Sequence, residues 1–500
     1  MSNTLLNAMK ESANIKRTEN GAISYKSTMN GLMDLFALGG SYRSRSDADV
    51  ICLFDKAFKE DETYALKCLF YLRDARCGQG ERRFFRTVAR WLAINHTDAI
   101  RRNLNQIPYF GRWDDLYVFV GTPVEKEVFN IMYHQLALDI KCKTPSLLAK
   151  WLKSENTSSA ESRVLGRKTR EAFKMTARQY RKTLSTLRAR INILERLMSE
   201  NRWDEIEFDK IPSRAGFIYR NAFARHDIER AQAERQTYAD FAKDKITKVN
   251  ADVLNPCEVV SKATNIYYKS LEDTERLMVN KYWDNLKDYF NNAVFNGVAV
   301  VDTSGSMTWD YSSGTNIKPI DVAISLGMYC AEKCNPNSPW YNHYISFSRI
   351  ARLIEIHGVD FCDKVRRIYE ADLCENTNIE SVFDLILNTA IAHKIKSEDM
   401  PKNIIIISDM EFDSATRYSG NVESVIETKL REYEAAGYEI PHLIFWNAAA
   451  RNDNIPIRDN GKVSYVSGYS PVIFEMIMTG KTGLDLVLDK LNSERYSCIN

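Results

Sequence analysis

The sequence predicts a multidomain protein in which an α-helical region, residues 1–290, precedes a doubly wound α/β domain, residues 291–500. Apolar residues recur at helical spacing in the first region, whereas short apolar strands alternate with helical stretches in the second. Residues 404–407 are four consecutive isoleucines, which is typical of a strand buried on both faces. The net charge of +2 divides at the same boundary, into +11 for the first region and −9 for the second.

The clearest helix of the first region is predicted at residues 176–199, where Thr176 and Gln179 form a capping box at the start. Its apolar face is formed by Tyr180, Leu184, Leu187, Ile191, Leu194 and Met198. The same periodicity predicts helices at 48–58, 62–75, 81–94, 124–140 and 217–246. An array of helix pairs would stack as a helical-repeat solenoid, although the sequence contains no repeat of fixed period.

In the second region the strands and helices alternate. Strands are expected at 297–301, 343–347, 353–356, 403–408, 441–446 and 463–466, and helices at 318–333, 379–395, 421–436, 471–478 and 483–492. This alternation predicts a mostly parallel sheet covered by helices. Ligands of such sheets bind at the carboxyl ends of the strands, near a switch in strand order.

The composition argues against several classes of protein. Hydrophobic residues make up 44% of the chain and charged residues 27%, but no stretch reaches the ~20 apolar residues of a membrane helix. Because the first residues also lack the apolar core of a secretory signal, we expect an intracellular, cytoplasmic protein that does not bind membranes. The ten cysteines are dispersed without a CxxC pair and are interpreted as free thiols. No HExxH, GxSxG, P-loop or Rossmann fingerprint is present, so we expect no catalysis, and a metal-dependent hydrolase is the weakest alternative.

Oxygen-bearing side chains follow three predicted strand ends or loops of the α/β domain. The predicted strand 297–301 runs into Asp302, Ser304 and Ser306, which form a DxSxS motif. Thr377 precedes a predicted helix, and Asp409 follows the isoleucine strand. Hydroxyl and carboxylate oxygens suit Mg²⁺ or another divalent cation. Each residue alone could be a helix cap or a turn residue, but their order favours one shared metal site.

This constellation resembles the metal-ion-dependent adhesion site of von Willebrand factor A (vWA) domains. The resemblance implies that the two serines and Thr377 ligate the metal, and that Asp302 and Asp409 act largely through water. It also implies a free coordination position for an acidic residue of a partner protein. Met410 stands where the family has a small glycine, which puts the geometry of that loop in doubt but not the type of ligand.

A basic surface is predicted within the helical region, because residues 163–190 contain ten Lys or Arg and the single acid Glu171. Such a surface favours binding of a nucleic-acid backbone. The candidate RNA-binding residues are Arg163, Arg167, Lys168, Arg170, Lys174, Arg178, Arg181, Lys182 and Arg188. A second cluster, at residues 73–90, has acids nearby. For both clusters the alternative is a solvated surface, or pairing with the acids of neighbouring helices.

The whole chain resembles an uncharacterised family of viral and plant proteins that join a helical region to a vWA-like domain. The resemblance rests on YLRDARCGQGERRFFR at 71–86, GRWDDL at 111–116, RQYRKTLSTLRARINILERLMSENRWDEIEFDKIPS at 178–213, IPHLIFWN at 440–447 and VSGYSP at 466–471. This layout is distantly similar to the Ro autoantigen family, whose ring of HEAT-like helical repeats, the TROVE module, binds small structured RNAs and is closed by a vWA domain.

These resemblances imply a non-catalytic RNA-binding scaffold, a Ro-like ribonucleoprotein component whose vWA-like domain holds Mg²⁺. Its RNA would be small and structured, or single-stranded, and a viral member of the family would act in the host cytoplasm. The alternative is a metal-dependent protein-interaction module that captures an acidic side chain of a partner protein.

Overall fold

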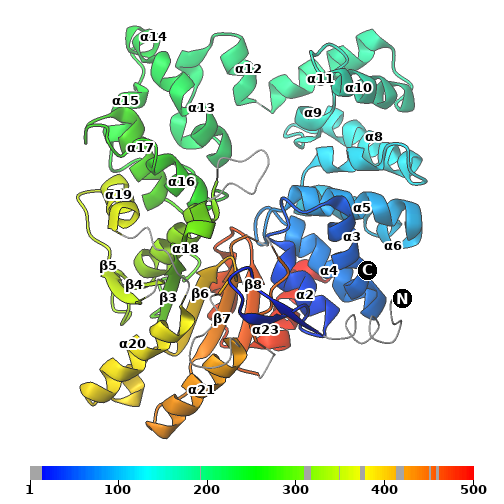
Figure 1. Ribbon diagram of the computed structural model, residues 1–500. Helices are drawn as coiled ribbons and strands as arrows, with labels where there is room; N and C mark the ends of the chain where they lie inside the picture. Colours follow the sequence, from blue (N-terminus) through cyan, green and yellow to red (C-terminus); the bar gives the residue numbers. More distant parts are fainter. Residues whose placement is uncertain are drawn as a thin grey trace. The chain divides into compact units, whose positions relative to one another are not determined.

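The computed structural model describes residues 14–191, 193–308, 317–347, 350–371, 378–412, 422–449, 452–457 and 461–500. The chain forms two compact units (Figure 1). The α/β unit contains residues 1–68 and 254–493, and the helical unit contains residues 69–253 and 494–500. The structure therefore combines a helical region with a mixed sheet in the second half of the chain.

A six-stranded sheet forms the centre of the α/β unit. Its strands are β3 (Gly297–Asp302), β4 (His343–Phe347), β5 (Arg352–Glu355), β6 (Asn403–Ser408), β7 (His442–Asn447) and β8 (Val463–Ser467). They lie in the order β5-β4-β3-β6-β7-β8 (Figure 1). Neighbouring strands are parallel except for the edge strand β5, which is antiparallel to β4. All six strands that the sequence predicts are present.

The strand order places a switch point between β3 and β6. From β3 the chain adds β4 and β5 on one side, and from β6 it adds β7 and β8 on the other. Helix α18 (Pro319–Lys333) packs against β3, β4 and β6, and α20 (Ile379–Ala392) packs against β4 and α21 (Val422–Ala435). Other helices of the α/β unit are α16 (Pro256–Ala263), α17 (Thr274–Asp284), α19 (Phe361–Ala371), α22 (Val472–Ile477) and α23 (Gly483–Leu491). Doubly wound sheets bind ligands at the carboxyl ends of the strands on either side of such a switch point, which here are β3 and β6.

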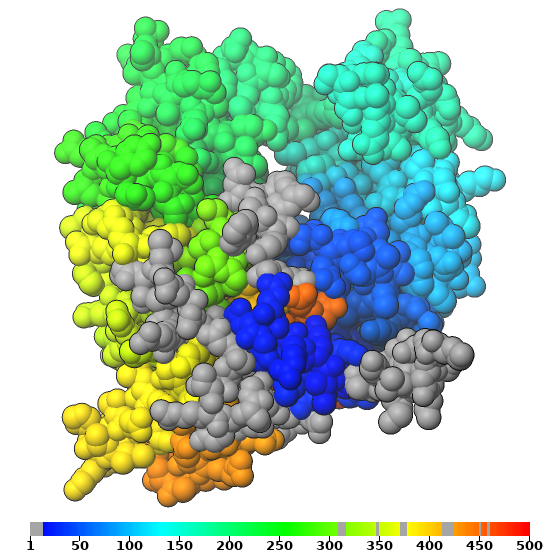
Figure 2. Space-filling model, viewed as in Figure 1, coloured from blue at the N-terminus to red at the C-terminus, as the bar shows by residue number. Residues whose placement is uncertain are grey.

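The N-terminal segment belongs to the α/β unit. The sequence pattern instead predicts one boundary, at residue 290, between the helical region and the α/β domain. It forms a short hairpin of β1 (Ile15–Arg17) and β2 (Ile23–Tyr25), followed by α2 (Gly31–Gly39) and α3 (Asp47–Glu60). Every residue of α2 is buried, and the helix packs against β8 and β7. Figure 2 shows dark-blue atoms of this segment beside orange atoms of the C-terminal half. The apolar surface of α2 therefore completes the core around β8.

The helical unit contains most of the helices predicted in the first region. The longer ones are α5 (Arg82–Asn95), α8 (Glu125–Lys141), α10 (Ala160–Ala172), α11 (Ala177–Arg190) and α13 (Ser213–Arg225), and α4 (Glu62–Arg73) leads into the unit. Shorter elements are α6 (Thr97–Arg101), α7 (Ile107–Phe110), the 3₁₀ helix η2 (Trp113–Phe119), α9 (Leu148–Trp151), α12 (Leu194–Ser199), α14 (Asp227–Gln232) and α15 (Tyr238–Lys243). In the described ranges, no helix is long and apolar enough to cross a membrane.

Two predicted helices are divided in the structure. The predicted helix 176–199 becomes α11, whose capping box of Thr176 and Gln179 is confirmed, and α12. The predicted helix 217–246 lies within a stretch that becomes α13, α14 and α15, because Glu234 adopts a positive φ of 55° and Thr237 caps a new helix. The C-terminus also joins this unit, since the ring of Tyr496 stacks on Phe110 with centroids 5.5 Å apart.

Candidate functional site

Four of the predicted metal-site residues lie at the switch point of the sheet. In the parallel pair of β3 and β6, Val301 lies opposite Ile407, so both strands end at the same edge. Asp302 is the last residue of β3, and Asp409 directly follows β6. Both side chains are buried, with exposed fractions of 0% and 1%. The fold thus brings two carboxylates from distant segments to the edge where doubly wound sheets bind ligands.

Hydrogen bonds fix the side chain of Asp302 at this edge. Its Oδ1 accepts the backbone N–H of Ser304 at 2.9 Å, and its Oδ2 accepts the hydroxyl of Ser408 at 2.6 Å. The hydroxyl oxygens of Ser304 and Ser306 lie 3.1 Å apart. Adjacent ligands of an octahedral Mg²⁺, each about 2.1 Å from the ion, are separated by about 3.0 Å. The serine pair therefore has the spacing of two neighbouring Mg²⁺ ligands.

The electrostatics of this edge are those of a negative cluster. Burial, together with the nearby charge of Asp409, raises the pKa of Asp302 to about 7. Burial also raises the pKa of Glu411, and the nearby charge of Asp409 adds to this increase. In the described ranges, no three His, Cys, Asp or Glu residues are grouped so that they could hold a metal. A cation at this edge would thus need hydroxyl ligands as well as the two aspartates, and the predicted hydroxyl ligands are Ser304, Ser306 and Thr377.

Four of the five predicted metal-site residues therefore belong to one edge: Asp302, Ser304, Ser306 and Asp409. Thr377 lies outside the described residues. Sequence reasoning missed Ser408, whose hydroxyl orients Asp302, although its position at the end of the isoleucine strand was a usable signal.

The N-terminal hairpin also contributes to this edge, which the sequence did not predict. The carboxylate of Glu411 accepts the backbone N–H of Glu19 at 2.6 Å and the side-chain amides of Asn452 and Asn454 at 2.9 and 2.7 Å. Thr18 donates its hydroxyl to the carbonyl of Phe412 at 2.8 Å. The segment that follows Asp409 is therefore held in place by residues from both ends of the chain.

In the helical unit, the predicted RNA-binding residues fall into two groups. Five have exposed side chains that form no ion pair or hydrogen bond within the part of the chain that the structure describes. These five, on α10, on α11 and in the turn between them, are here called the basic face: Arg167, Lys174, Arg178, Arg181 and Lys182. Their guanidinium and ammonium groups are available to an external anion.

The other four predicted residues have partners inside the unit. Arg163 donates to the carbonyls of residues 157 and 158, both at 2.8 Å. Lys168 lies 3.9 Å from a carboxylate oxygen of Glu125, and Arg170 pairs with Glu155 at 2.9 Å. Arg188 is half-buried and donates to the carbonyls of residues 149 and 152, both at 2.8 Å. Arg188 therefore holds the segment after α9 in place instead of extending the basic face.

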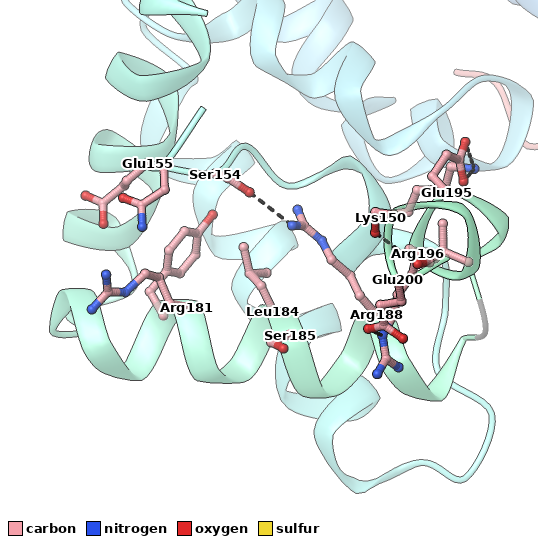
Figure 3. A pocket seen from close by; sticks show the side chains of 14 residues that line it. Lys150, Ser154, Glu155, Arg181, Leu184, Ser185, Arg188, Glu195, Arg196 and Glu200 are labelled. Carbon is pink, nitrogen blue, oxygen red and sulfur yellow. Dashed lines mark hydrogen bonds and ion pairs between the residues drawn. The ribbon is translucent and has the colours of Figure 1, made fainter. Parts of the chain in front are cut away.

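An open cavity of about 620 Å³ lies beside α11 (Figure 3). Arg181 of the basic face lines it together with Tyr180, Leu184 and the acids Glu155 and Glu200. The figure shows the bond of 3.0 Å that Arg188 donates to the hydroxyl of Ser154 on the cavity wall. The wall thus combines apolar and charged groups, next to the exposed cations of α11.

The second basic cluster, at residues 73–90, is partly neutralised. Arg73 pairs with the buried Asp115 at 2.7 Å, and Arg86 pairs with Asp114 and Asp115 at 2.9 and 2.7 Å. For these two arginines the structure confirms the alternative interpretation of pairing with neighbouring acids.

The chain is similar to two families of unknown function. Residues 18–163 and 139–293, more than half of the chain, match the domain of unknown function DUF2828, and residues 296–495 match the domain of unknown function DUF7788. An uncharacterised protein of Acanthamoeba polyphaga mimivirus is 30% identical, over 94% of this chain and 85% of its own length. The crystal structure of the Deinococcus radiodurans Ro (RSR) protein is similar with a TM-score of 0.48 and 13% identity, over 91% of this chain and 100% of that chain.

Proposed function

The chain belongs to the DUF2828 family, and we propose that it is a non-catalytic RNA-binding scaffold whose helical unit holds RNA on the basic face. This proposal depends mainly on one observation: the side chains of the five basic-face residues are exposed and have no acidic partner in the described ranges. Cations that are not neutralised within a protein bind phosphates with release of the counterions of the nucleic acid. The resemblance of the sequence layout to Ro-type proteins supports the same conclusion.

The α/β unit is proposed to bind Mg²⁺ or another divalent cation as a second element of the scaffold. Ser304 and Ser306 would ligate the ion directly, with Thr377 as a further hydroxyl ligand. Asp302 and Asp409 would balance its charge, partly through coordinated waters. The negative cluster at the sheet edge and the spacing of the serine hydroxyls support this assignment.

The second candidate function is a metal-dependent protein-interaction module. It is favoured by the location of Asp302 and Ser304 at the switch point of the sheet, where doubly wound sheets bind their ligands. The bound cation would supply a Lewis-acidic site for a carboxylate, and the partner would be an acidic protein. In that case the basic face would contact the acidic partner and not RNA.

The absorbance ratio at 260 and 280 nm of the purified protein separates the two functions. RNA binding predicts co-purifying nucleic acid, a high ratio, and a fall of the ratio after nuclease treatment at high salt, because counterion release makes affinity fall steeply with ionic strength. The protein-interaction module predicts a low ratio throughout and a protein partner that dissociates when the divalent cation is chelated. A low ratio, with no binding of added RNA at low salt, would contradict the proposal.

A further inference from the structure

Two sequence motifs of the helical unit, at residues 71–86 and 111–116, meet in an arginine cluster. We define this cluster as Arg73, Arg82, Arg86 and Arg112. Asp114 and Asp115 of η2 pair with the guanidinium groups of Arg73, Arg86 and Arg112, and Arg82 lies one helical turn before Arg86 on α5. Only glycine fits at position 111, because the carboxylate of Asp115 and the guanidinium of Arg73 occupy the space that a Cβ would fill. The motifs are therefore parts of one structure.

The two carboxylates of this cluster bind three of its four arginines. Asp115 accepts from Arg73 and Arg86, at 2.8 and 2.7 Å, and from the backbone N–H of Arg112 at 2.9 Å. Asp114 accepts two bonds from the guanidinium of Arg112, at 2.8 and 2.7 Å, and one from Arg86 at 2.9 Å. All four carboxylate oxygens are thus engaged by three arginines, and in the described ranges none accepts a hydrogen bond from Arg82.

Arg82 is the arginine without a partner. Its side chain is exposed and makes no hydrogen bond or ion pair within the described ranges. Partial burial and the guanidinium groups of Arg112, Arg86 and Arg73 lower its pKa to about 10, and Asp114 opposes this effect. An anion beside Arg82 would offset this repulsion between guanidinium groups.

The position of Arg82 in its helix points to the same conclusion. It is the first residue of α5, and Glu81 at the N-cap provides no side-chain hydrogen bond to the helix. Because the N-terminal end of a helix carries partial positive charge, a cation there is unfavourable and an anion is favourable. A residue that violates such a local preference without an internal partner is characteristic of a binding site.

The arginine cluster is linked to α11 through the segment that follows α9. The guanidinium of Arg112 lies 3.9 Å from the ring centroid of Trp151, and Lys153, two residues further on, lies 5.7 Å from that of Tyr117. The segment that carries both residues is bound to α11, because Arg188 donates to its carbonyl groups and the hydroxyl of Tyr180 donates to the carbonyl of Lys153 at 2.9 Å. The elements that carry the arginine cluster and the basic face are thus bound to one another.

We propose that Arg82 and Arg112 form a binding site for phosphate groups, and that the backbone of RNA held on the basic face occupies it. This inference rests on the proposed function and adds a second contact region to it. Arg112 is already anchored by Asp114 and Trp151, so it provides a fixed guanidinium beside the freely available one of Arg82. Guanidinium groups bind phosphates through paired hydrogen bonds, which an arginine at this position supplies.

The test compares Arg82→Gln with Lys245→Gln, which removes the same charge from an exposed lysine that has no partner in the described part of this unit. We expect Arg82→Gln to weaken the binding of a long single-stranded RNA about fivefold at about 0.1 M salt and to reduce the salt slope by about 0.7, the value for one phosphate contact. Lys245→Gln should leave affinity and slope unchanged, and Arg82→Lys should restore part of the affinity. Fluorescence anisotropy of labelled RNA measures all four proteins.

A second measurement uses inorganic pyrophosphate as a small probe of the same site. Pyrophosphate should raise the melting temperature of the wild-type protein and of Lys245→Gln, but not that of Arg82→Gln. Without ligand, Arg82→Gln should melt no lower than the wild type, because the substitution relieves repulsion with three arginines. This result would separate a binding role from a structural one.

The outcomes distinguish this inference from the proposed function. If wild-type protein and Arg82→Gln bind RNA with equal affinity and slope, the phosphate site is wrong while the RNA-binding function stands. If the wild-type protein binds no RNA, the proposed function fails and the pyrophosphate measurement alone decides. Stabilisation by pyrophosphate that is lost in Arg82→Gln would then support a site for free phosphates, and an equal response of both proteins would overturn it.

Discussion

Replacing Arg178, Arg181 and Lys182 together by Gln is expected to weaken RNA binding about 100-fold at about 0.1 M salt. Each lost phosphate contact with a single strand removes about 0.7 from the salt slope and, at this ionic strength, about 0.7 log units of affinity. The three side chains are exposed and have no partner in the described ranges, so the folded structure should be retained. RNA titrations at several salt concentrations give both the affinity and the slope.

A control with the same change in charge is available in the same unit. Lys243, Lys245 and Lys248 are exposed and have no partner among the described residues. Their triple replacement by Gln should leave the affinity for RNA almost unchanged if binding depends on the basic face. Equal losses in the two triple variants would show that only the net charge of the unit matters, and would contradict the assignment of a specific surface.

Asp302→Asn is expected to abolish the stabilisation of the protein by Mg²⁺. A ligand that binds only the folded state, at a free concentration of about 100 times its Kd, stabilises by about 2.7 kcal/mol. The wild-type protein should gain about this amount in the free energy of unfolding, and the variant should gain almost none, because it lacks the carboxylate that balances the ion. Thermal or urea unfolding with and without Mg²⁺ measures the difference.

The pH dependence of the same experiment has a defined sign. In the folded, Mg²⁺-free protein the pKa of Asp302 is raised from 3.8 to about 7, so the folded state holds this proton more tightly than the unfolded state. The contribution of Asp302 to stability is therefore present below about pH 4 and is lost as the pH rises towards 7. Mg²⁺ needs the deprotonated carboxylate, so its stabilising effect should be larger at pH 8 than at pH 6.

Asp321→Asn provides a matched control for this prediction. Asp321 is also buried in the α/β unit with a raised pKa, chiefly through burial, but its carboxylate accepts hydrogen bonds from Tyr369 and from the backbone of Lys318, and it does not belong to the predicted ligand set. This variant should keep the response to Mg²⁺ and its dependence on pH. A Mg²⁺ response that survives in Asp302→Asn, or that disappears equally in Asp321→Asn, would argue against a metal site at the switch point.

The features of the fold that could be predicted are those that depend on local pattern. The isoleucine run at residues 404–407 identifies β6 because only a strand buried on both faces tolerates it. The position of Asp302 beside Asp409 follows from the same reasoning, since parallel strands end at one edge. The resemblance to an uncharacterised viral family is confirmed by the family match and by the mimivirus relative.

Features that depend on contacts between distant segments could not be predicted. The apolar composition of α2 shows that it is buried, but nothing in residues 31–39 indicates that β8 is its partner. The strands β1 and β2 have three residues each, too short for an alternating pattern to be recognised. Likewise, Arg188 belongs to the same predicted basic stretch as Arg181, and only the structure shows that its guanidinium binds carbonyl groups of the neighbouring segment.

Mapping of ultraviolet RNA–protein crosslinks by mass spectrometry tests the central claim most directly. If the helical unit holds RNA on the basic face, crosslinked peptides should come from residues 160–190, and their yield should fall when competitor RNA or high salt is added. Crosslinks confined to the α/β unit, or equal yields with the Arg178, Arg181 and Lys182 triple variant, would contradict an RNA-binding surface on α10 and α11.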